Sequence, residues 1–537
     1  MVMERTQLIE ELACTSSWIQ IIVVDTRIVS EKIGVEIKTG VKANVRLNID
    51  TSASISSDGV EAKIVGLGFK VGKLTGFSTP LGEFEINFGK MFGPGGLSLY
   101  HSLIKNKDKK EFNVKIFERE SGPKDRWQGY HVGFTSQGFR SLMNCIPSSV
   151  ALNLPKAIPN PVPDVEYHGV SANDHEGNLL LRPPFKQFKD IYEIAEIPDH
   201  FLSMTVAYRD RLREVLLENV PVQWGKKLVK YEETDEGVWV NFEDGSQEFC
   251  DILVDASGVN SPVRKQKIPE LQINDMGANF VVANIIVPKH LMDRLIKVNG
   301  NSLVQKTLGL NGDATLIALR LIPIEQEQNY NNKNNFDELH YRTTIAYFYS
   351  SELDNDETEK FKVDDNNPES VVEHVKNMIR KLRPECEMTD ILLELWDLAP
   401  KAIPKKSEDY LFKTYNPIQL RKVRDINPLT INSWTSSRVT LIGDAVHAMS
   451  PLLGLGTTHA IQDAEALSQA LLEYSPENYI SCIKEYENKM LKRAPVDVLK
   501  SRDATINHVT PVGYFGLIIR NNILKTTNFL MKVHDLL

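Results

Sequence analysis

The stretch RVTLIGDAVHAMSPLLGLGTTHAIQDAEALSQALLEY, residues 438–474, contains the pattern that decides the fold. Its first five residues predict a buried strand, which ends at Gly443 and Asp444. A loop with two glycines follows, and from Ala460 onward the apolar residues recur at helical spacing. An acid at the carboxyl end of a strand, followed by loop amides and a helix N-terminus, can bind a polar ligand. On these residues alone, a capped helix and a tight turn without any ligand is the alternative.

A second glycine-rich stretch, KMFGPGGLSLYHSL at residues 90–103, has the form of the downstream half of a dinucleotide-binding loop. The residues just before it, EFEINFGKMF, alternate charged and apolar side chains, unlike a central parallel strand. Further upstream, the short apolar run EAKIVGLG ends in Gly66 and Gly68. Joining Gly68 to Pro94 would complete a G-x-G-x-x-G motif with Gly66, Gly68 and Gly96 as its glycines. The sequence therefore predicts a pyrophosphate loop that is split by residues 69–93.

The segment after this loop supports the prediction. FNVKIFERE predicts a second strand, and its Glu118 lies where an acid binds a ribose hydroxyl. Residues 69–93 are either a surface excursion or a translated intron or other gene-model artefact, and their aperiodic composition favours the artefact. A glycine-rich surface turn without a ligand is the alternative to the loop itself.

The segment GDAVHAMSPLLGLGTTHAIQDA, residues 443–464, is similar to the G-D motif of FAD-dependent monooxygenases of the aromatic-hydroxylase type. Thr458 stands where this family usually has Asn, and a hydroxyl replaces only part of the hydrogen bonding of an amide. DILVDASGVNSPVRKQ resembles the D-G motif of the family, with Ser257 at the usual Asp position. RWQGYHVGF and YRDRLREVLL resemble two further cofactor-binding segments, so the resemblance covers residues 61–505.

The resemblance implies FAD as the cofactor, NAD(P)H as the reductant, and a flavin edge lined by Pro451 and Gly454. The FAD-binding residues that it implies are Gly66, Gly68, Gly95, Gly96, Glu118, Arg126, Gln128, Arg209, Gly258, Asp444, Gly456, Thr457 and Thr458.

Four of these polar and charged positions have a structural interpretation as well. Arg126 and Arg209 could be surface charges whose aliphatic stems pack on a helix. His447 is expected to be a buried structural histidine, and Asp463 is expected to cap or pair at a helix terminus, so neither is assigned a catalytic role.

The implied activity is the insertion of one oxygen atom from O2 into a small organic substrate, aromatic or of polyketide or terpenoid type, through a flavin hydroperoxide. Two alternatives are a flavin dehydrogenase or reductase on the same fold, and a pseudoenzyme with impaired FAD binding. The flavin would supply the reactive chemistry, so neither a nucleophile triad nor a metal site is expected.

The expected fold class is α/β: a Rossmann-like FAD-binding domain, interleaved with a mostly antiparallel substrate-domain sheet and followed by C-terminal helices. Four strand candidates with few helical signals between residues 278 and 350 predict that second sheet. The expected division is an unassigned extension (1–60), FAD-binding parts (61–155 with the anomalous insertion 69–93, 206–270 and 431–505), substrate-domain parts (156–205 and 271–430) and a C-terminal amphipathic helix (506–537).

The composition indicates which kinds of partner and which cellular compartment to expect. The net charge of −9 argues against nucleic acid, and five scattered cysteines fit a reducing compartment. No segment is long and apolar enough to span a bilayer, and WIQIIVV at residues 18–24 predicts a strand or a buried patch. We therefore expect a soluble, cytoplasmic protein. Residues 512–537 are amphipathic with interspersed basic residues, and they either dock on their own domain or contact a membrane surface peripherally.

Overall fold

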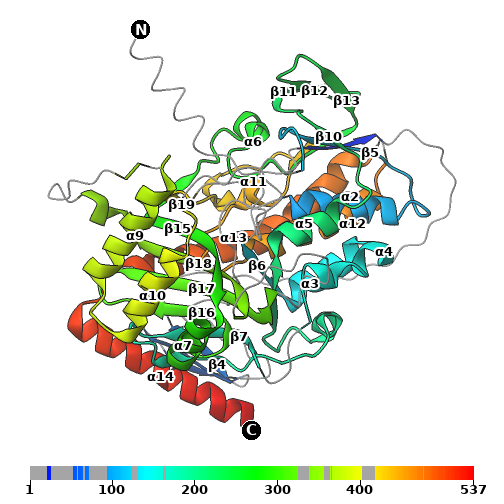
Figure 1. Ribbon diagram of the computed structural model, residues 1–537. Coiled ribbons are helices and arrows are strands. Elements are labelled where there is room, and N and C mark those ends of the chain that lie inside the picture. The colour runs from blue at the N-terminus through cyan, green and yellow to red at the C-terminus, as the bar shows by residue number, and fades with distance from the viewer. Residues whose placement is uncertain are drawn as a thin grey trace.

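The computed structural model describes residues 21–25, 53–56, 59–64, 67–71, 93–123, 130–160, 165–324, 338–355, 363–364, 366–401, 418–475 and 477–536, with the backbone alone for the strands before residue 72. Two large sheets organise these residues, one of five strands and one of seven (Figure 1). The fold is α/β with an interleaved antiparallel sheet, as the sequence predicts.

The five-stranded sheet has the strand order β10-β5-β1-β14-β20. Its strands are β1 (Ile21–Asp25), β5 (Asn113–Glu118), β10 (Val222–Trp224), β14 (Ile252–Asp255) and β20 (Val439–Leu441). β10 pairs parallel with β5, and β14 pairs parallel with β20. The central strand β1 runs antiparallel to both of its neighbours. The other four strands therefore point the same way, and their carboxyl ends meet at one edge of the sheet.

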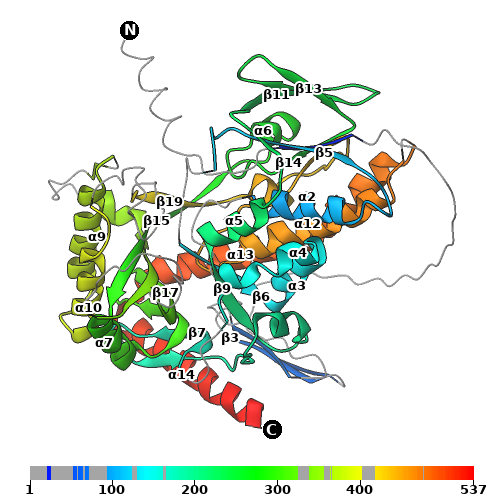
Figure 2. The same ribbon diagram turned by 45° about the vertical axis from the view of Figure 1, so that its right-hand side comes forward.

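Helices pack on one side of this sheet, and a small meander lies on the other (Figures 1 and 2). The helices are α2 (Pro94–Lys105), α5 (Arg209–Leu217), α12 (Gly456–Leu472) and α13 (Tyr479–Val509), with α3 (Ser136–Cys145) and α4 (Ser148–Ala151) beside them. The meander contains β11 (Leu228–Glu233), β12 (Val238–Phe242) and β13 (Gln247–Cys250), and α6 (Pro262–Lys267) packs against it.

The seven-stranded sheet has the order β19-β15-β18-β17-β16-β7-β8 and is antiparallel except where β16 pairs with β7. Its strands are β7 (Tyr167–Asn173), β8 (Leu179–Leu181), β15 (Asn274–Pro288), β16 (Ser302–Leu308), β17 (Asp313–Pro323), β18 (His340–Ser350) and β19 (Arg421–Asp425). The four strands predicted between residues 278 and 350 are thus confirmed as β15 to β18. One face packs on α7 (Lys289–Asn299), α9 (Pro368–Leu382) and α10 (Glu387–Asp397) around a second apolar core.

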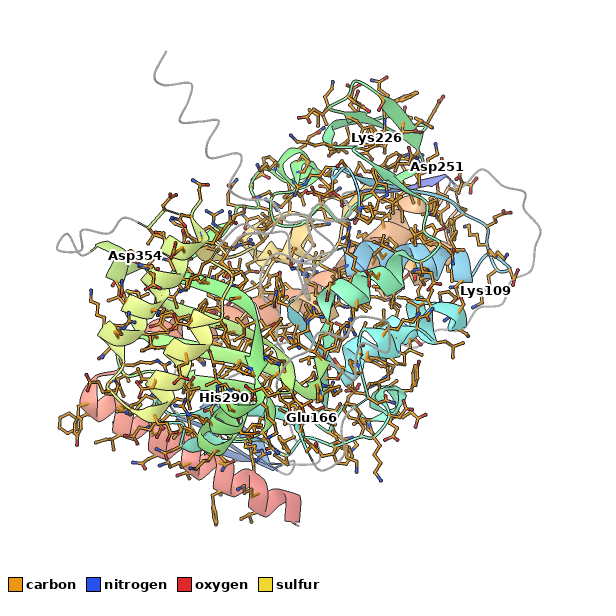
Figure 3. The ribbon with its side chains drawn as sticks, in the orientation of Figure 1. Lys109, Glu166, Lys226, Asp251, His290 and Asp354 are labelled. Carbon is orange, nitrogen blue, oxygen red and sulfur yellow. The ribbon has the colours of Figure 1, made fainter. Side chains whose placement is uncertain are left out.

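Two buried ion pairs connect elements of the seven-stranded sheet with each other and with α5. Glu166, labelled in Figure 3, precedes β7 and contacts the Arg320 guanidinium of β17 at 2.9 Å. Burial raises the pKa of Glu166, but Arg320 and the hydrogen bonds to the carboxylate outweigh this and lower it overall. At the contact between the two sheets, Arg342 of β18 lies 2.5 Å from Asp210 of α5.

The structure differs from the sequence prediction at the strand before the glycine-rich helix. EAKIVGLG does not join the five-stranded sheet: β3 (Gly59–Ile64) and β4 (Leu67–Val71) form a hairpin, and with β2 (Ala53–Ser56) they make a separate sheet. Figures 1 and 2 place that sheet on the opposite side of the molecule from β5. The central position is taken by β1, whose sequence IIVVD is more continuously apolar than GVEAKI and so suits a site buried on both faces.

Strand pairing assigns two neighbouring segments to different sheets. Residues 247–255 are divided, since β13 belongs to the meander while β14 belongs to the five-stranded sheet. α5 begins at Arg209, because Ala207 and Tyr208 end β9 (Met204–Tyr208), which pairs with β6 (His131–Thr135).

Candidate functional site

A cavity lined mainly by glycines opens where the carboxyl ends of β14 and β20 meet the start of α2. Three chain segments that are far apart in the sequence supply its walls. The lining residues are Gly93, Gly95, Gly96, Ala256, Gly258, Ile442, Gly443, Asp444 and Ala460. The structure therefore brings together four residues that the sequence predicts for the FAD site, Gly95, Gly96, Gly258 and Asp444, and it places Gly443 beside them.

The first turn of α2 lines this cavity through Gly95 and Gly96. Gly93 precedes the helix, Pro94 occupies its first position, and the Leu97 amide donates to the Gly93 carbonyl at 2.8 Å. Proline fits this position because its missing N–H would have no partner inside the helix. A side chain on Gly95 would place its Cβ 2.8 Å from the Ala460 carbonyl oxygen of α12. Glycine at 95 therefore lets two helices approach closely while the first turn stays open to an anion.

Glu118 ends β5 as a fully buried carboxylate. Its Oε1 accepts from the Glu120 amide at 3.1 Å, and its Oε2 is buried with no hydrogen-bond partner among the described residues. Burial raises the pKa of Glu118 to about 8. A buried carboxylate oxygen without a partner costs free energy, and a ribose hydroxyl would supply the missing donor. This atom is the strongest indication that the residues present fit FAD.

Arg209 begins α5 and is completely buried, so the surface interpretation of this residue is wrong. Its guanidinium lies 4.3 Å from the centre of the Tyr130 ring. Burial holds the pKa of Arg209 well below its usual range; Arg421 and Arg213 lower it further, whereas Asp444 acts in the opposite direction. Several cationic side chains thus gather beside the Asp444 wall of the cavity, and a bound pyrophosphate would compensate that charge.

The loop after β14 is fixed by its own side chains. Asp255 accepts from the Ser257 amide at 3.0 Å and from the Ser261 hydroxyl, while Ser261 caps α6 by accepting from the Arg264 amide at 2.7 Å. Burial raises the pKa of Asp255 to about 6. Gly258 adopts φ +80°, which a side chain would strain, and it lines the cavity. The motif therefore presents backbone to the cavity.

His447 and Asp463 hold the turn after β20 from behind. The Asp463 Oδ2 accepts from the Gly443 amide at 2.8 Å and lies 2.6 Å from the His447 Nε2, while Oδ1 contacts the Arg493 guanidinium. Both side chains are fully buried. The structural interpretation of His447 and Asp463 is confirmed, because their contacts position the Gly443 backbone at φ +60° beside the cavity.

The remaining predicted residues do not line the cavity, and three of them lie outside the described residues. Pro451 and Gly454 form a turn with the Gly454 amide donating to the Pro451 carbonyl at 3.2 Å, and α12 starts at Gly456, with Thr457 buried next to it. None of these four lines the cavity, so their roles stay predictions. Gly66, Arg126 and Gln128 lie outside the described residues.

Two predicted cofactor residues are placed away from the cavity. Gly68 lies in β4, paired with Lys63, because the local hairpin takes up its backbone hydrogen bonds. Thr458 packs against α3, where a Cβ on Gly138 would lie 2.3 Å from the Thr458 Oγ1. The hydroxyl at position 458 therefore fills a contact between two helices.

Sequence reasoning missed Gly93, Ala256, Arg213 and Arg421. Gly93 and Ala256 lie inside the quoted motifs, and only the tertiary structure shows that they line the cavity. Arg213 is one helical turn beyond Arg209, which is a weak local signal; Arg421 is far away in the sequence and gives none.

The sequence is similar to known FAD-binding proteins. The FAD binding domain family matches residues 394–496. An FAD-dependent monooxygenase, thnD of Trichoderma harzianum, is 26% identical over 427 residues, covering 76% of this chain and 90% of the relative. A 6-hydroxynicotinate 3-monooxygenase of Pseudomonas fluorescens is 23% identical over 397 residues, covering 71% of this chain and 82% of the relative.

Solved structures agree on the fold. The crystal structure of HpxO from Klebsiella pneumoniae, in complex with FAD and uric acid, superposes with a TM-score of 0.55 at 17% identity and covers 80% of this chain and 90% of HpxO. The matched family segment includes Asp444, which lines the glycine cavity. The family match and these relatives identify the chain as an FAD-dependent monooxygenase that is similar to the aromatic-hydroxylase family.

Proposed function

We propose that this monooxygenase uses NAD(P)H and O2 to insert one oxygen atom into a small organic substrate of aromatic, polyketide or terpenoid type. Bound FAD supplies the redox chemistry by accepting electrons from the reductant and activating O2. The name of the Pseudomonas relative, a monooxygenase of an aromatic ring, supports the aromatic class. The unpartnered carboxylate oxygen of Glu118 carries the cofactor part of this proposal.

The residues around the cavity would each contact a different part of FAD or of the substrate. The α2 N-terminal amides and Gly258 would approach the pyrophosphate, and the Glu118 carboxylate would accept from a ribose hydroxyl. Arg209 would compensate the phosphate charge from its buried position. Pro451 and Gly454 would line the flavin edge. The seven-stranded sheet would enclose the substrate and exclude water.

Substituting Glu118 tests the cofactor part. Glu118→Gln replaces the carboxyl oxygen that would accept from the ribose hydroxyl, so FAD affinity should fall about 10-fold, the range of one hydrogen bond. Quenching of flavin fluorescence measures the Kd directly. Glu111→Gln is the matched control, because Glu111 is exposed just before the same strand. Equal FAD affinity for Glu118→Gln and the parent chain would contradict the assignment.

Isotope labelling tests the reaction. Turnover under 18O2 with NADH or NADPH should place one labelled oxygen atom in the product. An oxidised or saturated product without label would identify a flavin dehydrogenase or reductase instead. A purified protein that lacks a flavin absorption band and does not take up added FAD would support the pseudoenzyme alternative.

A further inference from the structure

The C-terminal helix α14 (Gly513–Leu536) has two apolar faces on opposite sides. One face packs on the protein: Leu524, Thr527 and Met531 are buried and recur at spacings of three and four residues. The other face is exposed, with Phe515 at 79%, Tyr514 at 74% and Phe529 at 65% of full exposure. Helices that only dock on their own domain have a single apolar face. The exposed face of α14 therefore needs a separate explanation.

The exposed apolar side chains of α14 form a stripe of two clusters on one side of the helix. The first cluster contains Tyr514, Phe515, Ile518 and Ile519, and the second contains Phe529, Leu530 and Val533. The exposed polar residues Asn522, Lys525 and Thr526 lie between them. Residues 11 or 18 positions apart in a helix lie on the same side, because 3.6 residues make one turn. Phe529 therefore lies above Ile518, Leu530 above Ile519 and Val533 above Phe515. An exposed apolar stripe of this length commonly marks an interaction surface.

Basic residues border the stripe. Lys525 is exposed between its two apolar clusters and Lys532 is exposed at its edge, and residues 513–533 contain three basic residues and no Asp or Glu. The sequence as a whole has a net charge of −9, whereas residues 513–533 carry a net positive charge. In a symmetric contact between two copies, residues 513–533 of both helices would offer the lysines no acidic partner. An anionic lipid surface would instead neutralise them.

The helix lies at the edge of the molecule, where a flat surface can reach it. Figures 1 and 2 show α14 along the lower side, remote from the five-stranded sheet, and it packs on β8. Arg520 donates to the Gly309 carbonyl at 3.1 Å, and Asn528 accepts from the Arg182 amide at 2.9 Å, so the inner face is tied to the domain. Among the described residues, no helix is long and apolar enough to cross a membrane.

We propose that α14 is an interfacial membrane-binding helix, whose exposed stripe enters the headgroup region of an anionic bilayer while Lys525 and Lys532 contact lipid phosphates. The inner face keeps the helix on the enzyme, so binding requires no unfolding. This inference rests on α14 alone and does not depend on the reaction proposed for the FAD site.

Flotation of the full-length protein with phosphatidylcholine vesicles, with and without phosphatidylserine, tests the proposal. The protein should float with phosphatidylserine vesicles, and added salt should weaken the binding. Phe515→Ser combined with Phe529→Ser should abolish it. Lys525→Gln combined with Lys532→Gln should lower the partition coefficient about 30-fold. Leu152→Ser combined with Leu429→Ser is the matched control, because these apolar residues are equally exposed elsewhere.

Three outcomes would overturn the proposal: no flotation of the parent chain, flotation that survives the double Phe variant, or equal flotation with neutral vesicles. Sedimentation velocity without lipid tests the alternative that the stripe binds a second copy of the chain. Self-association that the double Phe variant removes, in a protein that does not bind vesicles, would assign the stripe to a second copy. Unchanged thermal melting of each variant shows that the fold is intact.

Discussion

The buried carboxyl of Glu118 makes the free energy of unfolding depend on pH. Its pKa is raised to about 8 by burial, from an ordinary value of 4.5, so the folded protein holds a proton at pH values where the unfolded chain has lost it. The folded state binds more protons throughout this window, and the free energy of unfolding contributed by Glu118 therefore falls as pH rises from 4.5 to 8.

We expect the cofactor-free protein to lose on the order of 2 kcal/mol of stability through Glu118 between pH 6 and pH 8. Urea titrations at both pH values measure this loss. Glu118→Gln should remove that part of the pH dependence, and Glu111→Gln should retain it. An identical pH dependence in the parent and Glu118→Gln would refute the raised pKa.

Gly138 and Thr458 form a size-matched pair between α3 and α12. A Cβ at position 138 would lie 2.3 Å from the Thr458 Oγ1, so Gly138→Ala should cost about 1–3 kcal/mol through overpacking, despite the better helix propensity of alanine. Thr458→Ala should recover most of this loss in the double variant. Chemical denaturation of the two single variants and the double variant gives the coupling energy. Additive losses would show that the two positions do not touch.

At the scale of elements, the central position of the five-stranded sheet is the unusual feature. β1 fills it in the antiparallel sense, whereas a strand that feeds the α2 loop would run parallel to β5 and β14. The residues predicted to do so, EAKIVGLG, contribute to a local hairpin instead. Two apolar segments of the chain can thus compete for one position.

Deleting residues 69–93 tests which segment belongs there. The deletion joins Gly68 to Pro94, completes G-x-G-x-x-G and removes half of the β4 hairpin strand, so the preceding strand is free to enter the sheet. We expect FAD affinity to rise about tenfold or more, because the loop amides regain a tight approach to the pyrophosphate. Fluorescence titration with FAD measures the change.

The matched control keeps the length and changes the composition, with residues 69–93 replaced by an equally long Gly/Ser segment. This variant should bind FAD no better than the parent chain. Unchanged or weaker FAD binding after the deletion would show that the interruption is tolerated. Sequencing the transcript gives an independent answer on whether the natural message encodes these residues.

At the scale of the whole molecule, buried polar contacts join the seven-stranded sheet to α5 and to β6. Arg342 of β18 pairs with Asp210 of α5 at 2.5 Å, and His131 of β6 lies 2.8 Å from the Thr344 hydroxyl. Burial and the nearby Arg342 and Arg320 lower the pKa of His131 well below its usual value, so this histidine is neutral at physiological pH. The contacts set the position of the substrate sheet relative to the FAD site.

Breaking the Arg342–Asp210 pair should therefore destabilise the molecule strongly. Arg342→Ala leaves a buried carboxylate without its cation and should cost about 3–5 kcal/mol in urea denaturation. Arg342→Met combined with Asp210→Leu should cost less, since neither charge then remains. Removing the exposed Lys227–Glu243 pair is the control and should change stability by less than about 1 kcal/mol. A cost for Arg342→Ala as small as that of the control would exclude a role of this pair in joining the sheets.

The sequence by itself determined the elements around the site and their chemistry. The strand, acid, glycine loop and helix at residues 438–474, the acid at position 118 and the four central strands of the second sheet were all predictable, because hydrophobic period and turn residues are local properties. The structural interpretation of His447 and Asp463 was one alternative from the sequence, and their contacts with each other and with Gly443 come from the tertiary structure.

Only the tertiary structure decided which distant residues meet. It gathered Gly93–Gly96, Ala256–Gly258 and Ile442–Asp444 into one cavity, buried Arg209 near other arginines, and packed Thr458 against Gly138. It also placed β1 rather than EAKIVGLG in the central position of the sheet. Strand pairing and helix contact depend on partners far apart in the chain, and local propensity cannot decide between two apolar segments that fit the same position.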